Sequence, residues 1–348
     1  MNHAIILAGG AGTRFWPLSR TNSPKQFLRL YSDKPMLEQT IRRISPFINR
    51  HNIYIATNKI YHKKVSRCLR GSGVPRENIF LEPQAKNTLA PIGLLSKNIY
   101  AKDKHAVVAV LPCDHYIKNK AAFLKILDKA VKQAGEGYIV TLGIKPTYPE
   151  TGYGYIKVKS GIRSPKICKV ERFLEKPDIN KAKEFLNNKK YYWNAGIFVF
   201  RPQILLDEVK KLAPREYAVL SKINNKRDLN RLWKKFTAVS IDYAIMQKSK
   251  RLGLLPADCG WVDLGSWRSI EYFSAKDKAG NIFKGNCIDT GSRDTLAWSD
   301  GRLLATVGLN GMIVVNTEDA ILVCDKNKTQ DVKLIVQALN LKKQYKQI

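Results

Sequence analysis

The first half of the chain alternates short apolar runs with amphipathic segments. Apolar runs without polar alternation are typical of strands buried on both faces of a parallel sheet, whereas apolar residues spaced three and four apart indicate helices. The runs predict strands over residues 4–8, 53–57, 78–82 and 106–111. The intervening segments predict helices over residues 36–48, interrupted by Pro46, and over 60–69, 88–100 and 121–134. Strands that alternate with helices predict βαβ units, and therefore an α/β fold with a mostly parallel sheet.

The pattern changes in the second half. Short β candidates at 137–142, 154–159 and 167–174 are followed by helical patterns at 179–186, 202–212, 229–236 and 241–248. From about residue 277, short β runs separated by glycine- and aspartate-containing turns lead to a predicted helix over 331–345. We expect two domains, 1–275 and 276–348, the second a small all-β module closed by a helix.

A glycine-dense turn follows the first predicted strand. Glycine adopts backbone conformations closed to other residues and lets peptide N–H groups approach an anion closely. The turn is neither a Walker A loop, since no Gly-Lys-Ser/Thr follows, nor a dinucleotide GxGxxG, since the sixth position is Phe15. A plain strand-to-helix turn would also need small residues, but the nearby polar and cationic residues favour phosphate binding. The residues of this candidate site are Gly9, Gly10, Gly12, Thr13, Arg14 and Lys25.

Acidic and polar residues end two further predicted strands. Glu82 precedes Asn87 and Thr88, which could bind a ligand or simply cap the next helix. Asp114 follows the most strongly apolar strand, beside His115. Ligands of parallel sheets lie beyond the carboxyl ends of the strands, so we expect the loops after residues 8, 82 and 111 to converge. Asp114 would suit a hard cation there, whereas His115 is expected to pack or hydrogen-bond.

A second aspartate lies late in the chain. Asp263 is flanked by apolar residues in GWVDLGSW, and a buried carboxylate is costly unless it is paired or metal-bound. Asp242, in an apolar run, could be only a helix cap.

Composition narrows the possible functions. The chain has 60 Lys plus Arg against 29 Asp plus Glu, a net charge of +31, which favours anionic partners. No nucleic-acid-binding motif accompanies the dispersed lysines, so phosphorylated small substrates are favoured over a specific nucleic acid. The six cysteines form no CxxC pair, and no apolar run of about 18 residues or basic leader is present, so we expect a cytoplasmic protein without a membrane span.

The motifs together resemble a known family. LAGGAGTRFWPLSR followed by SPKQF, then LPCDH and GWVDLGSW, are similar to the signatures of the nucleotidyltransferases that make nucleoside-diphosphate sugars. Trp16 and the PLSR ending resemble the mannose-1-phosphate guanylyltransferase branch. The resemblance covers nearly the whole chain and implies a Rossmann-like catalytic domain, a left-handed β-helix-like tail used for self-association as a homodimer, and one activity without an added isomerase domain.

The resemblance also implies roles for individual residues. Asp114 and Asp263 would bind Mg²⁺, and Arg14 and Lys25 would act in catalysis. GTP would be bound by the glycine-rich turn with Glu82, Asn87 and Thr88, in a loop that reads KNTLAP where the family usually has RNTAP. Mannose 1-phosphate would be bound by Gly152, Tyr153, Glu175, Lys176 and Asn194, with Ala195 in place of the usual serine.

Two alternatives remain open from the sequence. The chain could use another nucleotide or another sugar 1-phosphate, such as a heptose 1-phosphate. The charge of +31 also leaves open that the chain is a nucleic-acid-binding protein that has kept the transferase fold. Such a protein would bind RNA or DNA with a steep salt dependence.

Overall fold

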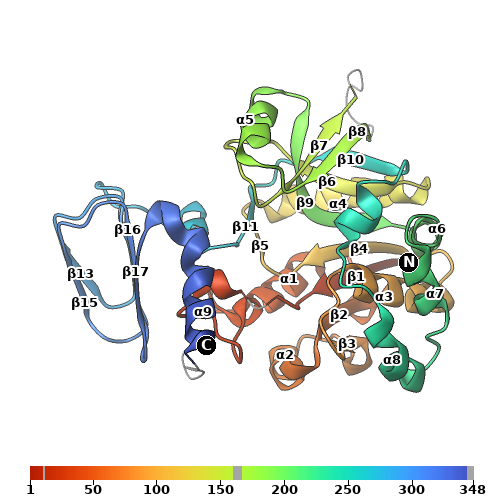
Figure 1. Ribbon diagram of the computed structural model, residues 1–348, viewed down its shortest axis with the longest axis horizontal. Helices are drawn as coiled ribbons and strands as arrows, with labels where there is room; N and C mark the ends of the chain where they lie inside the picture. Colours follow the sequence, from red (N-terminus) through yellow and green to blue (C-terminus); the bar gives the residue numbers. More distant parts are fainter. Residues whose placement is uncertain (11, 160–166, 343–348) are drawn as a thin grey trace. The chain divides into compact units, whose positions relative to one another are not determined.

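The computed structural model describes residues 1–10, 12–159 and 167–342. The chain divides into two compact units (Figure 1). Unit 1 comprises Met1–Gly9, Thr40–Cys113 and Ile117–Trp261, and unit 2 comprises Gly10–Gln39, Asp114–Tyr116 and the chain from Val262 onward. The predicted boundary at residues 275 and 276 stays a prediction.

Unit 1 is built on a mixed sheet of nine strands among the described residues, in the order β3-β2-β1-β4-β9-β6-β10-β8-β7. The strands are β1 (Asn2–Leu7), β2 (Ile53–Asn58), β3 (Ile79–Glu82), β4 (Val107–Pro112), β6 (Ile139–Ile144), β7 (Gly154–Val158), β8 (Cys168–Glu175), β9 (Tyr191–Phe200) and β10 (Leu252–Pro256). The first four pair in parallel, as their apolar runs predict. Strand β9 runs antiparallel to both β4 and β6, so the second half of the sheet is mixed.

The helices mostly match the predicted ranges. They are α1 (Met36–Ile44), α2 (His62–Cys68), α3 (Leu89–Lys102), α4 (Lys120–Gly135), α5 (Ile179–Asn187), α6 (Pro202–Leu212), α7 (Pro214–Ser221) and α8 (Lys226–Leu232). The prediction omitted α7, and it placed an ordinary helix where Asp242–Met246 forms a π-helix. Within the described residues, no helix has the length and apolarity needed to cross a bilayer.

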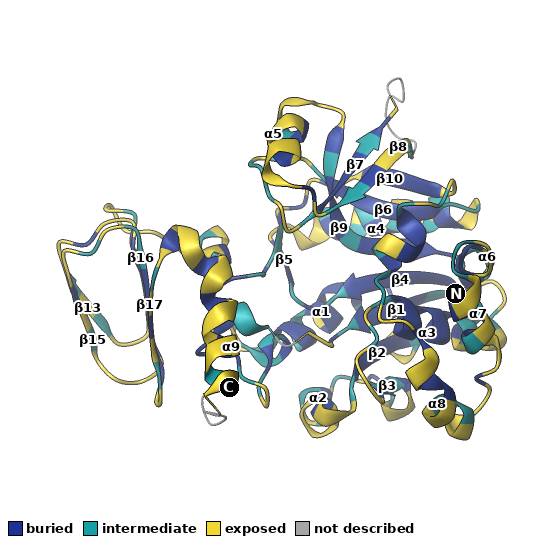
Figure 2. Ribbon diagram, viewed as in Figure 1, coloured by how far each residue is buried: buried dark blue, intermediate teal, exposed yellow. Residues whose placement is uncertain are grey.

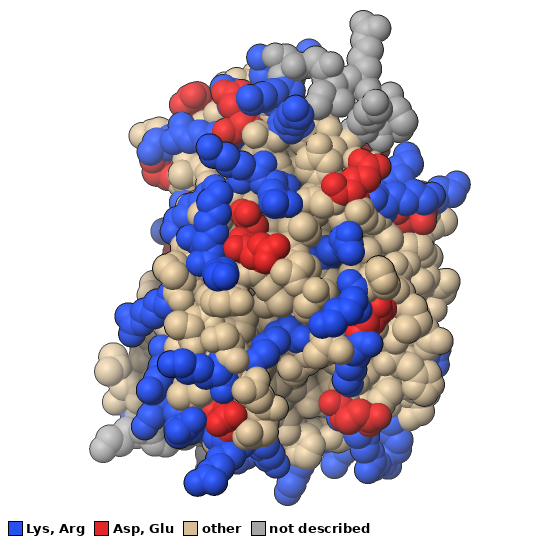
Figure 3. Space-filling view, turned by 90° about the vertical axis from the view of Figure 1, so that its right-hand side faces the viewer, with Lys and Arg blue, Asp and Glu red and all other residues tan. Residues whose placement is uncertain are grey.

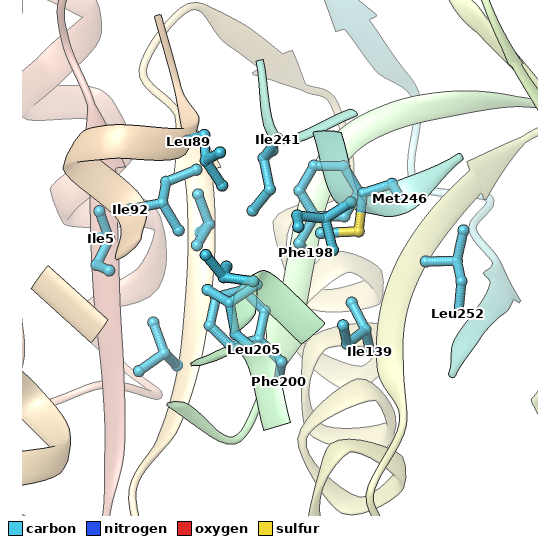
Figure 4. Close-up of a cluster of buried hydrophobic side chains, with 14 of the residues drawn as sticks. Ile5, Leu89, Ile92, Ile139, Phe198, Phe200, Leu205, Ile241, Met246 and Leu252 are labelled. Atoms are coloured by element: carbon cyan, nitrogen blue, oxygen red, sulfur yellow. The ribbon is translucent and has the colours of Figure 1, made fainter. Parts of the chain in front are cut away.

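The core of unit 1 explains why the parallel strands are apolar throughout. Figure 4 shows side chains from β1, α3, β9 and α6 meeting in one cluster, among them Ile5, Ile92, Phe200 and Leu205. Figure 2 shows the central strands buried, while the outer faces of the helices are exposed. This core fixes the strand ends from which the site loops emerge.

Unit 2 contains the C-terminal strands and the loop that follows β1. Its strands are β12 (Ile282–Lys284), β13 (Cys287–Thr290), β14 (Leu296–Ser299), β15 (Leu304–Val307), β16 (Met312–Asn316) and β17 (Ile321–Asp325), followed by α9 (Val332–Leu341). Parallel pairing of β12 with β14, β14 with β16, and β13 with β15 fits a β-helix-like module. The last predicted residues of the terminal helix, 343–345, lie outside the described residues, and the left-handedness stays a prediction.

The glycine-rich loop packs on this module. Phe15 and Trp16 are buried in one cluster with Trp267, Leu296 and Val336. The indole Nε1 of Trp267 donates a hydrogen bond of 2.8 Å to the carbonyl of Trp16. The C-terminal residues therefore help to hold the conformation of the loop.

Candidate active site

The loop after β1 has a conformation that requires glycine. Gly12 has a φ of +67°, and a Cβ at this position would lie 2.5 Å from Cβ of Lys25. The Ser19 hydroxyl donates to the Gly12 carbonyl. The loop thus turns sharply and passes directly over the Lys25 side chain. Ala11 lies outside the described residues.

Arg14 is held in the short 3₁₀ turn Thr13–Phe15. Its Nε is buried and has no hydrogen-bond partner among the described residues. A buried, unsatisfied guanidinium N–H is costly, and an anionic oxygen is the partner that would satisfy it best. This supports the prediction that Arg14 faces a phosphate.

Lys25, Asp114 and Asp263 form the charged centre of unit 2. Strands β5 (His115–Ile117) and β11 (Trp261–Asp263) pair, and the Leu264 amide donates a 3.0 Å hydrogen bond to the Asp114 carbonyl. This pairing brings Asp114, His115 and Asp263 together, with one ligand atom from each within 4.8 Å of the others. Lys25 Nζ forms an ion pair with Asp114 Oδ2.

The electrostatics of this centre keep Asp114 ionised. Burial alone would raise the pKa of the Asp114 carboxyl, but the Lys25 ammonium lowers it, with the net effect that the pKa is lowered. Two carboxylates and an imidazole are a suitable donor set for a divalent cation. The ring of His115 lies close enough to the two carboxylates to belong to this set, whereas the sequence predicted that His115 packs or hydrogen-bonds; that assignment stays a prediction.

The predicted nucleotide loop lies at the end of β3 in unit 1. A Cβ on Gly9 would lie 3.7 Å from Oε1 of Glu82, so the ends of β1 and β3 converge as expected. Burial raises the pKa of the Glu82 carboxyl to about 7. A carboxyl poised near neutrality can accept or donate a hydrogen bond, which suits contact with a polar ring edge.

The rest of this loop is fixed by backbone contacts. Lys86 Nζ donates to the carbonyls of Lys234 (3.0 Å) and Phe236 (2.7 Å), so this lysine anchors the loop. Asn87 has a φ of +61°, a conformation uncommon for a non-glycine residue. The Thr88 hydroxyl accepts from the amide of Ile241 at 2.9 Å instead of capping α3.

The predicted sugar-phosphate residues lie in unit 1 and include a buried carboxyl, that of Glu175. Oε2 of Glu175 is buried without a hydrogen-bond partner among the described residues. Burial, and then the charge of Asp242, raises the pKa of Glu175 to about 7. Lys176 Nζ lies 3.7 Å from Oε1 of Glu175, and its amide donates to the Tyr153 carbonyl. The Gly152 amide donates to Glu150 at 2.7 Å.

Asn194 is buried in a polar network that sequence reasoning missed. Its Oδ1 accepts from the Thr141 hydroxyl (2.9 Å) and the Gly196 amide (3.1 Å). Its Nδ2 donates to Asp242 Oδ1 at 2.9 Å. Burial raises the pKa of Asp242. The signal in the sequence is an aspartate within the otherwise apolar run of residues 241–246, a position that also fits a simple helix cap.

Comparison with known proteins identifies the family. The nucleotidyl transferase family model matches residues 3–280, and the model of the MannoseP isomerase/GMP-like beta-helix domain matches residues 285–339. The chain is a nucleotidyl transferase. Both the predicted α/β fold and the β-helix-like tail are confirmed by these matches.

Similarity over nearly the whole of this chain identifies the branch of the family. This nucleotidyl transferase is 38% identical to a mannose-1-phosphate guanylyltransferase of Salmonella muenchen over 347 residues, which cover 96% of this chain and 72% of the relative. It is 36% identical to the alginate biosynthesis protein AlgA of Pseudomonas aeruginosa, over 97% of this chain and 72% of AlgA. The crystal structure described as mannose-1-phosphate geranyltransferase from Thermus thermophilus matches with a TM-score of 0.88 and 30% identity, over 97% of this chain and 99% of that one. The chain belongs to the mannose-1-phosphate guanylyltransferase family.

Nucleotidyl transferases generally use a divalent metal. The cluster of Asp114, His115 and Asp263 fits such an ion in this chain.

Proposed function

We propose that this nucleotidyl transferase transfers GMP from GTP to mannose 1-phosphate, producing GDP-mannose and pyrophosphate. The observation that carries the proposal is the Lys25, Asp114 and Asp263 centre, in a chain 38% identical to a mannose-1-phosphate guanylyltransferase. Mannose 1-phosphate and GTP are both strongly anionic, and this centre combines a fixed cation with a site for a second one.

The chemistry needs no general base. A sugar phosphate is largely dianionic at neutral pH, with a second pKa of about 6. One of its oxygens attacks the α-phosphorus of GTP, and the bond to the bridging oxygen breaks, so that pyrophosphate leaves with the electron pair. The enzyme must align two anions that repel each other and neutralise the charge that develops.

Different residues of the chain neutralise the phosphates, bind the metal and position the two substrates. Arg14 and Lys25 neutralise phosphate charge, and the glycine-rich turn donates backbone N–H groups. Asp114 and Asp263 would hold a divalent ion, which we propose is Mg²⁺ and which would supply Lewis-acid stabilisation of the phosphates. Glu82, Asn87 and Thr88 hold the nucleoside. Gly152, Tyr153, Glu175, Lys176 and Asn194 orient the sugar phosphate.

A panel of nucleotides against sugar 1-phosphates tests the substrate assignment. Pyrophosphate release would be measured with GTP, ATP, UTP and CTP, each combined with mannose, glucose and heptose 1-phosphates, in the presence of Mg²⁺. We expect the highest kcat/KM with GTP and mannose 1-phosphate. A higher kcat/KM for another pair would replace the assigned substrates, and no pyrophosphate release from any pair would reject the transferase activity.

We also propose a cytoplasmic homodimer. All six cysteines are free thiols, which fits a reducing compartment. The tail exposes large apolar side chains on β13, β15 and β17, namely Ile288, Val307, Ile321 and Val323. A second copy of the chain would cover them, and light scattering would report a mass of one chain instead of two if this is wrong.

A further inference from the structure

Helix α2 and the start of β3 enclose a pocket that the proposed reaction does not use. Its volume is about 540 Å³. The α2 side of the pocket carries Lys63 and Arg67, and Arg70 follows shortly after the helix. Arg76 and Ile79, which lie just before and at the start of β3, also line it. None of the candidate active-site residues lines this pocket.

The lining is cationic and has no counter-charge. Four of its side chains, those of Lys63, Arg67, Arg70 and Arg76, are positively charged, and no acidic residue lines the pocket. All four are exposed, and none has an ion-pair partner within the described part of the chain. Lys63 and Arg67 are one helical turn apart, a spacing at which like charges destabilise a helix. The arrangement therefore costs stability unless an anion binds.

The lining of the pocket contrasts with the mixture of charges on one face of the molecule. On the face shown in Figure 3, lysine and arginine side chains are spread widely, and small groups of acidic residues lie among them. The pocket lining, by contrast, gathers four cationic side chains and no acidic one. The positive charges also affect the neighbouring Lys64. Its pKa is lowered by burial and then by the charge of Arg67.

The pocket also contains other hydrogen-bond donors. The hydroxyl of Ser66 and the ring of His62 belong to the same wall. Hydroxyl, imidazole and guanidinium donors together are suited to phosphate oxygens, and a guanidinium binds them with two parallel hydrogen bonds. The volume of about 540 Å³ is within the range of small-molecule sites. The cations gather in this one pocket and do not form the extended basic stripe expected for nucleic-acid binding.

We propose that the pocket between α2 and β3 binds a multiply phosphorylated small molecule, either a nucleoside polyphosphate or an inorganic polyphosphate. Strand β3 runs from Ile79 in this pocket to Glu82 in the nucleotide loop. One short strand therefore links the pocket to the loop that is proposed to hold GTP.

Calorimetric titration with inorganic tripolyphosphate tests the proposal. The variant Lys63→Gln/Arg67→Gln removes two pocket cations one helical turn apart. The matched control Lys125→Gln/Lys129→Gln removes two exposed cations with the same spacing on α4. Both variants leave the proposed active site intact, so tripolyphosphate bound there would be the same in each protein.

We expect the wild type and the α4 control to show a tripolyphosphate site that the pocket variant binds at least about tenfold more weakly, as removal of two charge-assisted contacts predicts. Equal weakening in both variants, or no change in the pocket variant, would overturn the proposal. So would binding of an RNA oligonucleotide, but not tripolyphosphate, at the pocket. A parallel titration with guanosine tetraphosphate distinguishes the two ligand sources: tighter binding than tripolyphosphate indicates that the nucleoside is recognised, and equal or weaker binding indicates a site for the phosphate chain.

Discussion

The carboxyl of Glu175 should make the folded protein less stable at pH 8 than a Glu175→Gln variant. Its buried Oε2 has no partner among the described residues, and its pKa is raised from 4.5 to about 7 by burial and by Asp242. Between these two pH values the unfolded chain loses a proton that the folded chain keeps. The free energy of unfolding therefore decreases as the pH rises through this window, by about 3 kcal/mol at about 1.4 kcal/mol for each pH unit.

Urea unfolding of the wild type and of Glu175→Gln, at pH 5 and at pH 8, measures the contribution of this carboxyl to the free energy of unfolding. Any free-energy cost of burying the amide is independent of pH. The readout is therefore how the stability difference between Glu175→Gln and the wild type changes from pH 5 to pH 8. We expect Glu175→Gln to gain up to about 3 kcal/mol over the wild type at pH 8, and most of this gain to disappear at pH 5. Glu171 is an exposed control in the same strand, where a hydrogen bond from Lys157 lowers the pKa, so Glu171→Gln should give no gain at pH 8. A stability difference between Glu175→Gln and the wild type that does not change with pH would refute the reasoning.

Two further substitutions test how the site is positioned. Asp242→Asn removes the charge that accepts the Asn194 hydrogen bond, and it should raise the KM for mannose 1-phosphate about tenfold, the loss of one charged hydrogen bond, while the KM for GTP changes little. A change in both KM values to the same extent would indicate a general structural defect. Gly12→Ala should lower both the melting temperature and kcat, because a Cβ there clashes with Lys25. Gly291→Ala is the control, since that glycine also has a positive φ, +77°, but no atom within 4 Å of an added Cβ; equal effects on kcat would argue against the clash.

The parallel half of the sheet was predictable from the sequence, and the antiparallel strand β9 was not. Strands buried on both faces, such as β1 and β4, must be apolar throughout, so their pattern is strong. Strand β9 contains Asn194 and Gly196, which interrupt its apolar run, so its pattern fits a ligand-binding segment as well as a buried strand with a bulge. The π-helix at 242–246 is a single turn with i→i+5 hydrogen bonds, which is too short for the spacing of apolar residues to distinguish it from an α-helix.

The site was predictable where its residues follow a strand in a local motif. Asp114 lies two residues after the buried strand β4, and Asp263 lies in an apolar segment where an unpaired carboxylate would be costly. The bond between Asn194 and Asp242 joins residues 48 positions apart, and the packing of Trp16 on Trp267 joins residues still further apart. Such contacts depend on the tertiary fold and leave no local pattern in one sequence.

The rate of pyrophosphate release from GTP and mannose 1-phosphate, in Asp263→Asn compared with the wild type, tests the central claim most directly. The claim is that Lys25, together with the divalent ion that Asp114 and Asp263 would hold, neutralises the charge on the reacting phosphates. Asp258→Asn, which changes an exposed aspartate five residues earlier, is the matched control. We predict a decrease in kcat/KM of about 100-fold or more for Asp263→Asn, the size expected when one preorganised electrostatic group is lost, and no more than a small change for the control. Turnover of Asp263→Asn at the wild-type rate, in a folded protein, would contradict the account.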